Sequence, residues 1–220
     1  MPINKILRVA VSCNKNSMKT LIVFNHPYDG SFCNALLMAA KRGAEQCGEC
    51  GVINLDKENF NPVMSSHDLH AFVLARHEPE KALALLDKQV LAYKAKLEEA
   101  EHLAFIFPVW WMLMPALTKG FIDRVIVPLV AYDYAPDGTM QSRLEKLKRV
   151  TVLTTMNTPP DVYERNFGNA LSKALFQGTF EAIGIKNCHW ISLNMVSGVD
   201  EQQRERWLER VEEYFSSKTF

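Results

Sequence analysis

The stretch "HLAFIFPVWWMLMPALTKGFIDRV", residues 102–125, contains a strand, a loop and a helix in succession. Residues 102–107 have the length and apolar composition of a buried β-strand. The next segment is predicted to be a loop, because two prolines flank the adjacent Trp110 and Trp111. A helix is expected to follow from about Pro115 to Val125. This strand–loop–helix order decides the fold if it repeats along the chain.

The same order does repeat. Apolar, β-rich runs predict strands at residues 20–25, 51–55, 102–107, 149–156 and 187–196. Helices are expected at residues 31–47, 79–100, 115–125, 169–183 and 200–215. Alternating strands and helices imply βαβ units, right-handed crossovers and a parallel sheet. We therefore expect an α/β fold, a flavodoxin-like, doubly wound, five-stranded parallel sheet with helices on both faces.

Composition and charge narrow the class of protein. The 220 residues suit one domain, expected at residues 18–220 after an N-terminal extension over residues 1–17, because Met18 opens the first strand-like run. The 25 basic and 25 acidic residues argue against a nucleic-acid binder. No apolar stretch reaches the roughly 18 residues of a membrane span, so no membrane insertion is expected. An odd count of five cysteines and no convincing signal peptide suit a cytoplasmic protein.

Cys47 and Cys50 form a C-x-x-C motif that has two interpretations. A redox dithiol of the thioredoxin type would precede a helix, where the helix dipole lowers the thiol pKa. This motif follows a predicted helix, and Gly48 and Gly51 are typical of a helix end. We therefore favour a structural role.

Three loops are expected at the carboxyl ends of the first, third and fourth strands, where doubly wound sheets bind ligands. They comprise residues 26–32, 108–115 and 155–163. The first enters a helix whose N–H groups can hold a phosphate, assisted by Ser31 and His26. The second presents the two tryptophans, and the third offers hydroxyls and amides. Together they predict a site for a phosphorylated planar ring.

The loops resemble those of the NAD(P)H:quinone oxidoreductase family. "LIVFNHPYDGSFCNAL", residues 21–36, is similar to the family's first strand and flavin-phosphate loop. Residues 107–125 resemble F-P-x-x-W-x-x-x-P-A-x-x-K-G-W-x-[DE]-R-V, and Trp111 falls on the family tryptophan. At the end of the fourth strand the family usually has T-T-G-G, whereas residues 154–157 of this chain read T-T-M-N. The resemblance implies a cofactor site, without metal, made of His26, Ser31, Phe32, Cys33, Asn34, Pro108, Val109, Trp110, Trp111, Met112, Thr154, Thr155, Met156 and Asn157. It also implies Tyr163 as the active-site tyrosine.

This resemblance implies a flavin-dependent NAD(P)H oxidoreductase with tightly bound FAD or FMN, which reduces quinones or related acceptors by a ping-pong mechanism. Azo or nitro compounds are further acceptors to consider. Arg204 resembles an arginine that reaches the dinucleotide part of FAD in long members. Two alternatives are a one-electron carrier of flavodoxin type, which the neutral charge disfavours, and a regulatory subunit of a potassium-efflux transporter. We expect a homodimer, because residues 127–140 are rich in apolar and aromatic residues.

Overall fold

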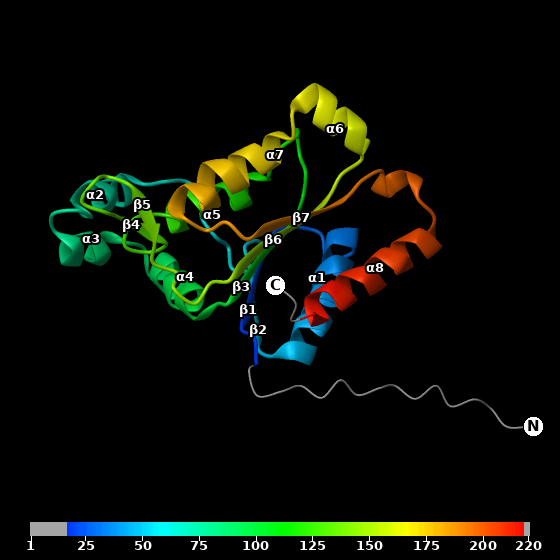
Figure 1. Ribbon diagram of the computed structural model, residues 1–220, viewed down its shortest axis with the longest axis horizontal. Helices are drawn as coiled ribbons and strands as arrows, with labels where there is room; N and C mark the ends of the chain where they lie inside the picture. The colour runs from blue at the N-terminus through cyan, green and yellow to red at the C-terminus, as the bar shows by residue number, and fades with distance from the viewer. Residues whose placement is uncertain (1–16, 218–220) are drawn as a thin grey trace, which may run out of the picture.

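The computed structural model describes residues 17–217. The extension expected over residues 1–17 therefore lies, apart from Ser17, outside the described residues. Five parallel strands form one sheet in the order β2-β1-β3-β6-β7 (Figure 1). Their bounds are β1 Thr20–Phe24, β2 Cys50–Asn54, β3 His102–Pro108, β6 Arg149–Thr155 and β7 Cys188–Leu193. The strand order reverses between β1 and β3, which confirms the predicted doubly wound topology.

Helices cover both faces of the sheet because successive strand residues point to opposite sides. Ile22 and Phe24 of β1 pack with α1 (Phe32–Cys47) and α8 (Glu201–Ser216). Leu21 and Val23 face the other side, against α4 (Lys88–Glu99) and α5 (Ala116–Val125). Figure 1 shows α1 and α8 together on one side of the strands.

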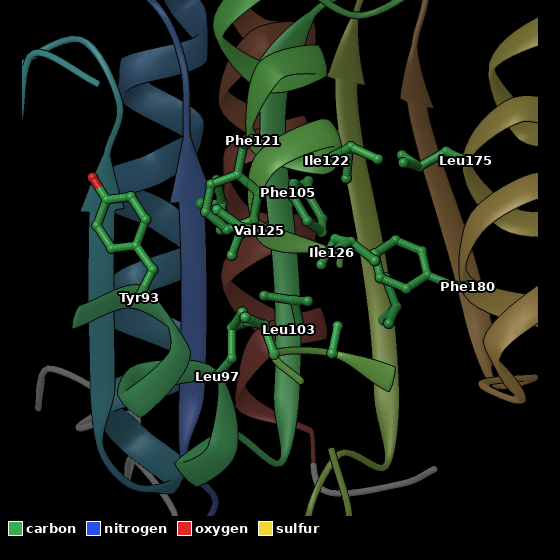
Figure 2. Packing of buried hydrophobic residues seen from close by; sticks show 14 of the residues in the cluster. Tyr93, Leu97, Leu103, Phe105, Phe121, Ile122, Val125, Ile126, Leu175 and Phe180 are labelled. Atoms are coloured by element: carbon green, nitrogen blue, oxygen red, sulfur yellow. The ribbon is translucent and has the colours of Figure 1, made fainter. Parts of the chain in front are cut away.

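The larger of the two core clusters contains a group of packed aromatic rings. Figure 2 shows Phe105 of β3, Phe121 of α5 and Phe180 gathered on one face of the sheet, and Phe105 lies 5.9 Å from Phe121 and 5.8 Å from Phe180 between ring centroids. Tyr93 of α4 lies 5.8 Å from Phe121. These tilted and edge-on rings are the geometries that aromatic pairs prefer. They anchor α4 and α5 and so fix the start of α5, directly after the aromatic loop.

Two helical predictions differ from the structure. The helix expected over residues 79–100 is broken into α3 (Pro79–Leu85) and α4, because the Asp87 side chain accepts a hydrogen bond from Gln89 N at 2.8 Å and caps a new helix. Residues expected to form a loop contain α6 (Pro160–Phe167), so that prediction was wrong. Pro160 lies in the first turn, where a proline is tolerated, and Gly168 ends the helix with a φ of 60°.

The helix expected over residues 169–183 is present but irregular. It consists of α7 (Ala170–Ser172), a π-helical segment (Lys173–Phe180) and a 3-10 turn (Glu181–Ile183). Gly184, with a φ of 91°, ends it as the sequence predicted. Phe180 of the π-helical segment belongs to the aromatic core.

Residues 127–140 bury or half-bury their apolar side chains, apart from Pro136. They lead into a hairpin of β4 (Tyr132–Tyr134) and β5 (Met140–Ser142), and Leu129, Val130, Ala131 and Tyr132 are buried in the subunit's own core. These residues therefore do not supply the exposed apolar surface on which the expectation of a homodimer rested. Exposed apolar side chains instead lie on and just before α2 (Ser66–Leu74). These are Val63, Leu69, Phe72 and Val73.

A buried ion pair joins α2 to α5. Arg124 donates to both carboxylate oxygens of Asp68, from Nε at 3.0 Å and from Nη2 at 3.2 Å. Ser65 completes the arrangement, because Asp68 also accepts its backbone N–H at 2.7 Å in a capping box. Asp68 and Arg124 thus have structural roles. Among the described residues, no helix combines the length and the apolar character needed to cross a membrane.

Candidate active site

The carboxyl ends of β1, β3 and β6 bring the three predicted loops to one edge of the sheet. The β1 and β3 ends are tied by Asn25 N, which donates to Ile106 O at 3.0 Å. The β3 and β6 ends are tied by Val109 N, which donates to Thr155 O at 2.8 Å. Pro108 is buried as the last residue of β3.

The first loop ends in a helix terminus that can bind an anion. Ser31 caps α1, its Oγ accepting from Asn34 N at 3.1 Å. The N–H groups of Phe32 and Cys33 belong to the first turn, where an α-helix supplies no acceptor, and neither donates a hydrogen bond within residues 17–217. The dipole of this 16-residue helix adds positive potential at the same place.

His26 links the first loop to the aromatic loop. Its Nδ1 accepts a hydrogen bond from Tyr28 N at 3.1 Å, which curls the chain after β1. Its ring lies edge-on to Trp110, with 6.4 Å between ring centroids and 65° between ring planes. His26 therefore helps to place the tryptophan loop relative to the α1 terminus.

The aromatic loop is a tight turn with unusual backbone geometry. Trp110 and Leu113 exchange N–H···O bonds of 2.9 and 3.1 Å, and the two residues between them, Trp111 and Met112, have φ values of 47° and 64°. Positive φ at both central residues is the pattern of a type I′ turn, which normally contains asparagine and glycine. For tryptophan and methionine it is strained, and such strain concentrates at functional sites.

The turn directs Trp111 into solvent, where the residue is 97% exposed. Trp110 is 47% exposed. The N–H groups of Trp111 and Met112 make no hydrogen bond in the described part of the chain. The loop therefore offers a flat aromatic face together with two free backbone donors, which suits a planar ring with a polar edge.

Tyr163 of α6 holds this strained turn. Its hydroxyl donates to Met112 O at 2.7 Å and accepts from Leu171 N at 3.1 Å. The residue is 1% exposed, and burial raises the pKa of its hydroxyl. Trp190 packs edge-on against the ring at 5.6 Å. We therefore propose that Tyr163 positions the turn, in place of the catalytic role expected from the sequence.

Three predicted cofactor residues lie beneath the site and contact other protein groups. Cys33 Sγ lies 3.1 Å from Thr155 Oγ1, and burial raises the pKa of this thiol to about 11. Thr154 Oγ1 accepts from Trp190 Nε1 at 2.9 Å. These contacts join α1, β6 and β7 below the loops, so the two threonine hydroxyls do not extend into the site.

The third loop is held by a fourth loop, between β7 and α8, that the sequence analysis did not identify. Met156 N donates to Leu193 O at 2.9 Å, and Asn157 Oδ1 accepts from Ser197 N at 2.9 Å. Asn194 donates from Nδ2 to Thr158 O at 2.8 Å. Met156 and Asn157 stand where the family that the chain resembles has two glycines, and hydrogen bonds of the Asn157 and Asn194 side chains fix the backbone of this loop.

Asn25 is a second residue that the sequence analysis missed. It is buried after β1, where its Nδ2 donates to Asp56 Oδ2 at 2.7 Å and its Oδ1 accepts from Thr118 Oγ1 at 3.0 Å. A polar residue that closes an apolar strand was the available signal. Through these bonds Asn25 ties the first loop to α5, which follows the aromatic loop.

The C-x-x-C motif is remote from these loops. Cys47 is the last residue of α1, and its Sγ donates to Ser216 O at 2.6 Å. Burial raises the pKa of the Cys50 thiol to about 11, so this residue is not a thiolate near neutral pH. A helix of 16 residues spans about 24 Å. The interpretation of the motif as a helix end is confirmed.

Comparisons with known proteins identify the fold and the relatives of the chain. A family model described as flavodoxin-like fold matches residues 18–215. The chain is 24% identical over 196 residues to an uncharacterized NAD(P)H oxidoreductase of Haemophilus influenzae, covering 87% of the chain and 91% of that protein. It is 33% identical over 126 residues to NAD(P)H dehydrogenase (quinone) 1 of Rattus norvegicus, covering 53% of the chain but only 46% of the rat protein. The structure of an NAD(P)H:quinone oxidoreductase from Methanothermobacter marburgensis has a TM-score of 0.77 and 26% identity, over 92% of the chain and 99% of that structure.

Proposed function

The chain belongs to the family of proteins with the flavodoxin-like fold, and from this membership we propose that it is a flavin-dependent NAD(P)H oxidoreductase acting on quinones or related acceptors. The observation that carries the proposal is the strained turn of Trp111 and Met112. It exposes an aromatic face and two N–H groups without a hydrogen bond in residues 17–217, near a helix terminus that can bind an anion. A phosphorylated planar ring with polar edges is the ligand that such a set of groups fits.

Two sets of backbone N–H groups would bind different parts of a flavin. The N–H groups of Phe32 and Cys33, with the Ser31 side chain, would hold the phosphate at the start of α1. The N–H groups of Trp111 and Met112 would bind the polar edge of the ring. When bound, the flavin supplies the chemistry, taking a hydride from NAD(P)H and passing two electrons to the acceptor.

The protein itself would bind and orient the flavin and would restrict which acceptors can approach the ring. We propose that the nicotinamide and the acceptor use the same aromatic face in turn, which gives ping-pong kinetics. Acceptors thin enough to stack on a ring would be favoured. Cys33, Cys50 and Cys188 are free thiols, and this supports our proposal that the protein lies in the reducing cytoplasm.

Arg204 is the residue that would make the protein bind FAD more tightly than FMN. Phe32, at the start of α1, packs on Trp207 of α8 at 6.1 Å. Arg204 lies one turn closer to the beginning of α8, beyond the α1 terminus where the first phosphate would bind. Its Nη2 donates to Val196 O at 3.0 Å, while its buried Nε has no hydrogen-bond partner among the described residues. This guanidinium could bind a second phosphate, which only FAD has.

A second copy of the chain is the partner we propose, placed against the exposed apolar side chains of α2. Leu69, Phe72 and Val73 project from this helix without covering the core. Apolar side chains that gather on one exposed helix are typical of a subunit interface. Leu69→Asp with Val73→Asp should convert a dimer to a monomer in light scattering, whereas a wild-type protein that is monomeric at micromolar concentration would remove this part of the proposal.

The test of the function is reconstitution followed by turnover. The purified protein should bind about one flavin per chain and oxidise NAD(P)H with a quinone, with parallel lines in double-reciprocal plots. Titration with FMN and FAD should show tighter FAD binding that Arg204→Ala weakens, with FMN binding unchanged. If neither flavin binds saturably, the proposed function fails.

A further inference from the structure

A cavity of about 460 Å3 lies between the edge strand β2 and helix α4, at the end of the sheet opposite to the candidate active site. Its lining includes the first residues of β1 and β2, whereas the flavin loops follow the last residues of the strands. The volume is in the range of ligand sites. The lining residues are Lys19, Thr20, Leu21, Glu49, Gly51, Val52, Ala95, Lys96, Glu99 and Ala100.

Gly51 of β2 leaves the cavity open. It pairs in register with Leu21 of β1, and it is exposed although Leu21 is buried. A Cβ atom at Gly51 would lie 3.4 Å from Leu21 Cδ1, an ordinary contact distance, so the site has room for a side chain that β2 does not supply. A glycine inside a strand often marks a place where a ligand or another backbone approaches closely.

The α4 side of the cavity carries small side chains, those of Ala95 and Ala100. The two lysines and two glutamates of the lining balance in charge. Lys19 pairs with both glutamates, with Glu99 at 3.0 Å and with Glu49 at 3.9 Å. An uncharged apolar group therefore fits the cavity better than an ion does.

The backbone of β2 adds unused hydrogen-bonding groups beside the cavity. β2 is the last strand of the sheet and pairs only with β1 in the described part of the chain (Figure 2). Glu49 O accepts from Thr20 N at 2.8 Å, and Leu55 N donates to a β1 carbonyl at 2.9 Å. The odd-numbered residues of this segment therefore bond to β1, because the bonding direction alternates along a parallel strand.

Val52, between them, turns its N–H and C=O away from the sheet. Neither group has a hydrogen-bond partner among the described residues. The Val52 side chain packs on the other face of the sheet, with α1 and α8, so the backbone of this residue lines the cavity. One donor and one acceptor thus lie side by side at the rim of an apolar hollow.

We propose that this edge binds an extended peptide segment of a partner protein, which adds a strand to β2 and places an uncharged, branched apolar side chain in the cavity. In an antiparallel arrangement the peptide residue opposite Val52 exchanges two N–H···O bonds with it. The next residue lies opposite Gly51 and projects to the same face of the sheet, over Leu21. This inference goes beyond the proposed function and does not depend on it, because the cavity shares no residue with the flavin loops.

The test is calorimetric titration of the purified protein, with its flavin bound, using the capped peptide acetyl-Ser-Val-Leu-Val-Ser-amide as the probe. Its leucine is the side chain for the cavity, and its valines supply the backbone groups. We expect one site per chain with a Kd below about 1 mM. The same peptide with both valines N-methylated lacks these N–H donors and should bind at least about tenfold more weakly. A peptide with aspartate in place of leucine should also bind at least about tenfold more weakly.

Variants of the protein place the probe in the cavity. Gly51→Val should fill the hollow from the strand and abolish binding, and Ala95→Leu should weaken binding at least about tenfold from the helix side. Both positions are exposed, so both variants should fold. Ala92→Leu is the matched control, because Ala92 is exposed on the same helix and does not line the cavity, and it should bind like wild type.

Peptide binding that is absent, or that is equal in wild type and Gly51→Val, overturns the proposal. The Val52 amide hydrogen should exchange rapidly in the protein alone and slowly with the peptide bound. Slow exchange in the protein alone means that the chain itself or a second copy already covers the edge, and this also overturns the proposal. Flavin content and quinone turnover should be unchanged by the peptide, and on the same samples they report separately on the proposed function.

Discussion

Replacing Trp111 by asparagine should stabilise the flavin-free protein and weaken its affinity for flavin. The residue has a φ of 47° in a turn whose second central residue, Met112, is also in the left-handed region. The indole is 97% exposed, so its removal uncovers almost no buried apolar surface. The substitution therefore separates the cost of the backbone conformation from any loss of packing.

The expected magnitude follows from these two facts. A left-handed conformation costs an ordinary L-residue about 1–2 kcal/mol, and asparagine tolerates it better. We expect Trp111→Asn to raise the free energy of unfolding of the flavin-free protein by about 1 kcal/mol, or about 2–4 °C in Tm for a chain of this size. Loss of one aromatic stacking contact, about 1 kcal/mol, should raise the flavin Kd about fivefold.

Urea unfolding followed by far-ultraviolet circular dichroism measures the first effect, and flavin fluorescence titration measures the second. Trp111→Phe is the matched control, since it keeps both an aromatic ring and the unfavourable φ. It should be no more stable than wild type and should retain most of the flavin affinity. A flavin-free Trp111→Asn protein that is less stable than wild type, or that binds flavin as tightly, would refute the reasoning.

Three other predictions concern groups whose partners are known. Tyr163→Phe should destabilise the protein by about 1 kcal/mol and weaken flavin binding, since Met112 O loses its donor; an unchanged pH profile of kcat supports positioning, and a shifted one supports catalysis. Cys47→Ser with Cys50→Ser should keep kcat near the wild-type value, and loss of NAD(P)H turnover in this variant would restore the dithiol interpretation. Burial lowers the pKa of His102 in the folded protein to about 3. In the unfolded chain the histidine pKa is near 6.5, so the unfolded chain binds the proton first as the pH falls. The folded protein therefore loses stability as the pH falls below about 6.5. In urea titrations wild type should lose about 1.4 kcal/mol more than His102→Gln between pH 7.5 and 5.5, and equal losses would contradict the assignment.

The strands and the first helix could be predicted because their signals are local. Apolar runs define β1 and β3, and Ser31 marks the start of α1 with a side chain that caps it. Two predictions, the continuous helix over residues 79–100 and the loop that contains α6, were wrong because a residue that begins a helix was not recognised. Asp87 is a capping residue inside a stretch with a continuous helical pattern, and Pro160 is typical of a loop but is also favoured in the first turn of a helix.

The loops of the candidate site could be predicted from the sequence, but their backbone geometry could not. No glycine or asparagine marks the turn of Trp111 and Met112, because the left-handed backbone is held by Tyr163, 51 residues away from Met112 in the chain. The role of the β7–α8 loop also depends on long-range bonds, such as that from Asn194 to Thr158. Contacts of this kind have no local sequence signal.

The hydrogen bonds between the third loop and the β7–α8 loop have a consequence for biosynthesis. The N-terminal part of a nascent chain leaves the ribosome first. The elements α1, β3 and β6 therefore emerge before the segment that fixes Met156 and Asn157. Helix α8, which packs along α1, appears after β7. A nascent chain that stops before β7 therefore carries the phosphate-binding terminus and the tryptophan turn without their final support. Cofactor capture should accordingly be completed only when residues 188–216 have left the exit tunnel.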